Sequence, residues 1–134
     1  MSEIPKQLDW VKARWGCSLQ KVFETLREVI AGDVKSANEL NRPGVTFVLN
    51  TSEERITVTR RLNSGDPADS LSVVFELRTT DIVAVLPHRS KTLFYAHAVL
   101  NACGECMLEL EGVSDLKRPW QVSQKALDEL FFEF

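Results

Sequence analysis

Apolar residues recur at every third or fourth position through the first third of the chain. This spacing predicts one long helix from Asp9 to about Leu40, with Asp9 as a candidate N-cap and "NRPG" (41–44) as its end. Gly32 lies inside this segment and is expected either to kink the helix or to divide it in two. The apolar stripe comprises Trp15, Leu19, Val22, Leu26 and Val29, widened by Phe23, Ile30, Val34 and Ala37.

Two interpretations of this stripe are open. A helix that packs on a sheet has a broad apolar face, whereas the narrower seam from Leu19 to Val29 has the spacing of a short coiled coil. The stripe is wider than a seam requires, so packing on a sheet is favoured.

After Gly44 the apolar period changes from about 3.6 residues to two, which is typical of strands with one buried face. Because the connections are short, the strands are expected to pair as an antiparallel meander. The longest connection is the loop-like stretch "NSGDPADS" (63–70). The six predicted strands are "VTFVLN" (45–50), "RITVTRRL" (55–62), "LSVVFELR" (71–78), "DIVAVL" (81–86), "TLFYAHAVL" (92–100) and "CMLELE" (106–111).

The end of the chain returns to helical spacing. Either Pro119 occupies the first turn of this helix, or Ser123 caps a slightly later start. The expected fold is therefore a single α+β domain over residues 1–134, with a long N-terminal helix and a short C-terminal helix on one face of a six-stranded sheet. The apolar side of the second helix comprises Ala126, Leu127, Leu130, Phe131 and Phe134.

The stretch "LNACGECMLELEG" (100–112) contains a C-x-x-C motif, Cys103 and Cys106. A structural zinc site needs four ligands, and the motif supplies two without a second paired spacing elsewhere. A redox C-x-x-C usually begins a helix, whereas a predicted strand follows here. The third cysteine, Cys17, lies on the predicted long helix, and an odd number of cysteines does not suggest a disulfide framework. We expect no metal and no cofactor.

Turn chemistry gives the same stretch an ordinary explanation. If residues 102–104 form a three-residue hairpin loop, Gly104 takes the left-handed conformation that such loops require. Leu100 then faces Cys106, and the next pairs along the hairpin, Ala98 with Leu108 and Ala96 with Leu110, are also apolar. Cys106 is expected to be a core thiol and Cys103 an exposed one.

The same register turns Leu93, Tyr95, His97 and Val99 to the sheet face opposite the helices. There Tyr95 and His97 are candidate ligand- or partner-binding residues, together with Glu76 and Glu109 from neighbouring strands. Either carboxylate would make an acid–base pair with the imidazole. Arg55, Arg60 and Arg61 make the second strand basic, which is typical of an exposed or edge strand.

Composition narrows the classes of function. The 134 residues carry a formal charge of −3 with no block of Lys and Arg, so we expect no nucleic-acid partner. The first ten residues lack the pattern of a secretory signal, and no apolar run reaches 18 residues, so a cytoplasmic protein without a membrane span is expected.

No sequence motif identifies a reaction, so the leading hypothesis is a non-enzymatic binding domain. It would form a homodimer, or bind another protein, through the uncovered sheet face or the long helix. The alternative is a small-molecule pocket or enzyme that uses His97 and Tyr95.

Overall fold

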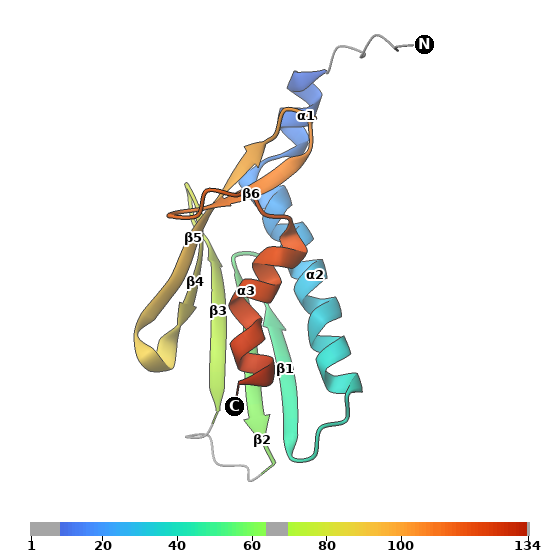
Figure 1. Ribbon diagram of the computed structural model, residues 1–134, viewed down its shortest axis with the longest axis vertical. Helices are drawn as coiled ribbons and strands as arrows, with labels where there is room; N and C mark the ends of the chain where they lie inside the picture. The colour runs from blue at the N-terminus through green and yellow to red at the C-terminus, as the bar shows by residue number, and fades with distance from the viewer. Residues whose placement is uncertain (1–8, 64–69, 134) are drawn as a thin grey trace.

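The computed structural model describes residues 9–63 and 70–133, which form three α-helices and a six-stranded antiparallel sheet (Figure 1). The strands lie in chain order, so the predicted α+β meander is confirmed. The predicted loop at 63–70 falls almost entirely outside the described residues, as does Phe134. The elements are α1 (Trp10–Gly16), α2 (Leu19–Glu39), β1 (Val45–Thr51), β2 (Arg55–Leu62), β3 (Leu71–Leu77), β4 (Ile82–Leu86), the short 3₁₀ helix η2 (Pro87–Arg89), β5 (Lys91–Leu100), β6 (Cys106–Leu110) and α3 (Pro119–Phe132).

The predicted long N-terminal helix is present as α2, but it begins at Leu19 and not near Asp9. The helix is interrupted at Cys17, and Ser18 then caps α2 by accepting a hydrogen bond from the Lys21 amide at 3.2 Å. Asp9 caps α1 as predicted. Gly32, the expected point of division, lies within an unbroken α2. The sequence signal for the true break is Gly16 followed by Ser18, a helix-ending residue next to a helix-starting one.

A disulfide joins this interruption to the sheet. Cys17 is fully buried and bonded to Cys106 at the start of β6, across 89 positions of sequence. The expectation that these two cysteines are unpaired thiols is therefore wrong. The C-x-x-C spacing suggests Cys103 as the neighbour of Cys106 in a site, whereas the residue bonded to Cys106 is Cys17, at the end of α1. Cys103 itself is a free, exposed cysteine, as predicted.

Helix α2 packs its apolar stripe against the sheet, as the broad-stripe interpretation predicted (Figure 1). Its buried residues are Val22, Phe23, Leu26, Ile30, Val34 and Ala37. Trp15 does not belong to this stripe, because it lies on α1, before the break, and is 77% exposed. The Asn38 side chain also fastens α2 to the edge strand β1, donating to the Phe47 carbonyl and accepting from the Phe47 amide, both at 2.9 Å.

Helix α3 begins with Pro119 in its first turn, the first of the two predicted starts. It lies beside α2 on the same sheet face and runs in the same direction (Figure 1). Ser123 is not a cap but a fully buried residue inside the helix. The core between the two helices and the sheet includes Phe75, Leu108 and Leu127, each with at most 1% exposure. Among the described residues, no helix is long and apolar enough to cross a membrane.

The β5–β6 hairpin has the predicted register. Leu100 pairs with Cys106, and the pairs Ala98–Leu108 and Ala96–Leu110 follow. Gly104 has a φ of 81°, the left-handed conformation that the three-residue loop requires.

Two predictions about strand faces are wrong. The β4–β5 register shifts between Ala84 and Val85, so Leu93 packs with the core on the helix side instead of facing away. Strand β2 is not an edge strand, because it pairs with β1 and β3, although its Arg55 and Arg61 side chains are exposed, as the other half of that prediction has it. Arg60 of β2 is buried on the core side, where burial first and then repulsion from Arg42 lower the pKa of its guanidinium.

Candidate functional site

The exposed large apolar side chains of the described residues belong to the helices and form two groups. One group lies on α1, and the other lies around the C-terminal end of α2 and α3. Large apolar side chains that lie together in water are a usual mark of a binding surface. The six residues are Trp10, Val11, Trp15, Leu40, Trp120 and Phe132.

All three tryptophans of the chain belong to this set. Trp10, Trp15 and Trp120 are 63%, 77% and 54% exposed. Tryptophan is highly buried on average in folded proteins, and it is enriched at the centres of protein interfaces. The core, in contrast, is built of Phe, Leu, Ile and Val. The largest apolar side chains of the chain thus lie on its surface and not in its core.

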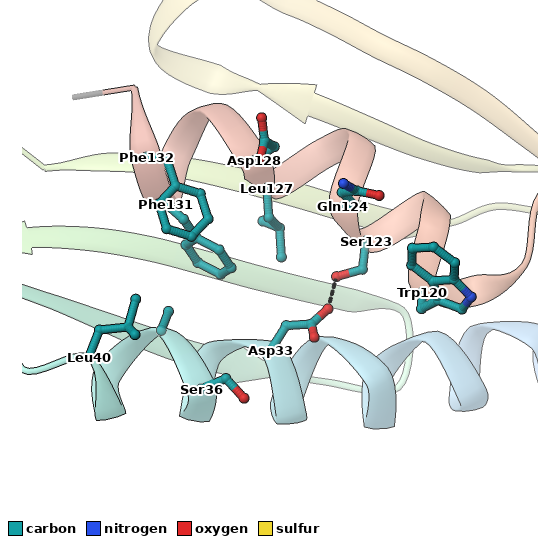
Figure 2. A pocket seen from close by; sticks show the side chains of 11 residues that line it. Asp33, Ser36, Leu40, Trp120, Ser123, Gln124, Leu127, Asp128, Phe131 and Phe132 are labelled. Atoms are coloured by element: carbon teal, nitrogen blue, oxygen red, sulfur yellow. Dashed lines mark hydrogen bonds between the residues drawn. The ribbon is translucent and has the colours of Figure 1, made fainter.

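A groove of about 420 Å³ runs between α2 and α3 on this side (Figure 2). Trp120 stands at one end, and Leu40 and Phe132 stand at the other. Leu127 and Phe131 form the apolar floor and are almost fully buried. The groove is lined by Asp33, Ser36, Ala37, Leu40, Trp120, Ser123, Gln124, Leu127, Asp128, Phe131 and Phe132.

The charged residues that line the groove are acidic. The Ser123 hydroxyl donates to Asp33 Oδ2 at 2.6 Å, which holds that carboxylate at the wall (Figure 2). Asp128 is exposed on the α3 side. The residues that line the groove include no basic side chain. At the far end Arg42 lies over the Phe132 ring, 6.0 Å from its centre, and donates to the Phe131 carbonyl.

Helix α1 carries the second group of exposed apolar side chains. None of its seven residues is buried. Trp10 and Arg14 are four positions apart, as are Val11 and Trp15, so the four side chains share one helix face. Lys12 is also exposed, which makes α1 basic where the groove is acidic.

The sequence-predicted candidates lie on the other side of the sheet. Tyr95 and His97 share its uncovered face, and the guanidinium of Arg78 lies 5.7 Å from the centre of the Tyr95 ring. His97 Nδ1 is 3.1 Å from the Thr80 carbonyl oxygen, and Nε2 is 3.1 Å from Glu111 Oε1. The hydrogen bond to Glu111 is the largest cause of a raised His97 pKa, opposed by partial burial and supported by Thr80.

The two predicted carboxylates do not bond to this imidazole. Glu76 pairs with Arg55 at 2.9 Å, and the β4 strand separates it from Tyr95. Glu109 is the direct cross-strand neighbour of His97 but is exposed. Glu111, which sequence reasoning missed, supplies the carboxylate. Because both ring nitrogens are engaged, the arrangement has the form of a structural ion pair.

Sequence reasoning also missed Leu40, Trp120 and Phe132 as surface residues. The signal for Trp120 is its position directly after Pro119, in the first turn of a helix whose apolar stripe lies elsewhere. Among the described residues, no group of three or more His, Cys, Asp and Glu side chains is placed to hold a metal ion.

In comparisons with known proteins, no family model matches the chain, and no curated protein or solved structure is significantly similar to it.

Proposed function

We propose that this chain is a protein-interaction domain that self-associates through its helix side. The observation that carries the proposal is the exposure of all three tryptophans together with Leu40 and Phe132, around one groove and one helix without buried residues. Aromatic side chains at such positions form the energetic centre of many protein interfaces.

The chemistry of the surface supports a protein partner over a small molecule. The groove is open to solvent, and exposed apolar side chains lie at both of its ends. Its charged groups, Asp33 and Asp128, lie on its two walls (Figure 2). An apolar groove between two helices is the usual receptor for an amphipathic helix. The uncovered sheet face, the other expected contact surface, is lined by side chains such as Thr57, Val74 and Tyr95, none of them a highly exposed large apolar residue.

Sedimentation velocity between 1 and 100 µM tests the proposal with two matched variants. Trp120→Asp places a charge at the groove and retains α3, because an acidic residue is favourable in the first turn of a helix. Thr57→Lys places a charge on the uncovered sheet face. We expect the wild type and Thr57→Lys to dimerise with a micromolar Kd and Trp120→Asp to remain monomeric.

Two results contradict the proposal. A wild type that is monomeric at every concentration removes self-association altogether. A dimer that Thr57→Lys abolishes and Trp120→Asp leaves intact moves the contact to the uncovered sheet face. Circular dichroism of both variants establishes that each retains the fold.

A further inference from the structure

We infer that the α2–α3 groove receives helix α1 of a second copy of this chain, and that two copies exchange their α1 helices reciprocally. The inference rests on the proposed self-association and names the two surfaces that meet. Each surface is exposed in the single chain: α1 has no buried residue, although Lys21 lies 5.4 Å from the centre of the Trp15 ring and Arg14 donates to the Cys17 carbonyl at 2.8 Å, and the groove is open with Trp120 and Phe132 exposed at its ends.

Charge favours this occupant. Helix α1 carries Arg14 on the face that includes Trp10 and Trp15, Lys12 on another side, and no acidic residue after its cap, whereas the charged residues that line the groove are Asp33 and Asp128. Opposite charges on facing surfaces fix the register of docking and disfavour contacts between like surfaces. Groove against groove would bring carboxylates together, and α1 against α1 would bring cations together.

Length permits it as well. A seven-residue helix is about 10 Å long, whereas the α3 wall of the groove extends about 18 Å from Trp120 to Phe132. The face that carries Trp10, Arg14, Val11 and Trp15 therefore fits within the groove. Aromatic side chains from α1 would then lie between Trp120 at one end and Phe132 at the other.

The groove of the same chain is out of reach of its own α1. The Cys17–Cys106 disulfide fixes the beginning of α2 to β6, and the 21 residues of α2 separate it from the Leu40 end by about 31 Å. Reciprocal exchange about a two-fold axis would place α1 of each copy in the groove of the other. Such an exchange is closed, so association stops at the dimer.

Charge reversal tests the pairing. In Lys12→Glu/Arg14→Glu the α1 helix becomes acidic, and in Asp128→Lys the α3 wall of the groove becomes basic. Asp128 is chosen instead of Asp33 because it is exposed, whereas Asp33 accepts the bond from buried Ser123. Each variant alone opposes like charges in both halves of its homodimer, so we expect a Kd about tenfold or more above the wild-type value.

Mixing the two variants is the decisive step. In the mixed dimer, acidic α1 meets a basic groove in one half, and unchanged α1 meets an unchanged groove in the other. We expect the mixture to dimerise with a Kd within about threefold of wild type, although each component alone is mainly monomeric. A variant that has lost its fold is not rescued by mixing, so rescue also serves as the folding control.

The outcomes separate this inference from the proposal beneath it. A wild-type dimer that Asp128→Lys does not weaken, or two weakened variants that fail to rescue each other, overturns α1 exchange and leaves self-association standing. In that case we expect the groove to bind a segment of a different protein. A wild type that is monomeric throughout removes the proposed function, and the exchange with it.

Discussion

His97 shows how one residue can be placed correctly and still be paired wrongly. The strand pattern puts its imidazole on the uncovered face, opposite Glu109. The chain continues beside β5 after β6 ends, because the Glu111 amide donates to the Tyr95 carbonyl at 3.0 Å. Glu111 thus sits diagonally from His97, and a long side chain bridges diagonal neighbours as readily as direct ones. An alternating pattern specifies faces and direct partners, but not which of two nearby carboxylates binds.

At this scale we expect His97 to titrate above 6.5, and Glu111→Gln to bring its pKa down toward that value. The largest cause of the raised pKa is the hydrogen bond to the Glu111 carboxylate, and glutamine replaces this charged acceptor with a neutral amide oxygen that binds the charged ring more weakly. Glu109→Gln is the matched control and is expected to leave the pKa nearly unchanged. Proton NMR of the imidazole in the three proteins measures this. If the pKa of His97 falls in Glu109→Gln and not in Glu111→Gln, the hydrogen bond to Glu111 is absent in solution.

The same pair makes a small, pH-dependent contribution to stability. Because the folded-state pKa is raised, the contribution is fully present below pH 6.5 and is lost as the pH rises through the folded-state value. The His97 and Glu111 side chains are 33% and 57% exposed, so the contribution is about 0.2–1 kcal/mol.

At the scale of elements, the local sequence pattern predicts the strands of the sheet correctly but does not predict where the first helix ends. Alternation, short connections and one left-handed glycine predict six strands in order and the β5–β6 register, because these depend on neighbouring residues. The apolar spacing in the sequence continues across Cys17, so periodicity alone does not detect the break between α1 and α2. The disulfide that fixes the break joins residues 89 positions apart, a distance at which no local pattern carries information.

The disulfide is expected to stabilise the fold by about 4 kcal/mol, because it closes a long loop in the unfolded chain. Urea unfolding of Cys17→Ser/Cys106→Ser against wild type measures this difference. Reductant should lower the stability of the wild type toward that of the double variant and leave the double variant unchanged. Cys103→Ser, which alters the exposed cysteine only, is the control and should unfold like the wild type. Equal stability of all three proteins would contradict a structural role for the bond.

At the scale of the whole molecule, the apolar pattern does not determine which apolar residues remain in water. The stripe that includes Trp15 predicts a core residue, and the position of Trp120 beside Pro119 gives no sign that it stands at the end of a groove. Those outcomes depend on how α1 projects from the sheet and how α3 lies beside α2 (Figure 1). Alternation in the sequence therefore predicts a candidate site on the uncovered sheet face, whereas the exposed apolar side chains of the structure lie on the helices. Their exposure depends on tertiary packing, which periodicity does not determine.

The position of the three tryptophans gives the last prediction. Each is more than half exposed in the single chain, and α1 exchange would bring Trp10 and Trp15 against the groove that Trp120 borders. We expect tryptophan emission to lie at long wavelength in dilute protein and to shift to shorter wavelength as concentration passes the Kd from sedimentation. Trp120→Asp, which we expect to stay monomeric, should show no concentration-dependent shift. Short-wavelength emission from dilute, demonstrably monomeric wild type would instead mean that the tryptophans are covered within one chain, and would remove the surface on which self-association is argued.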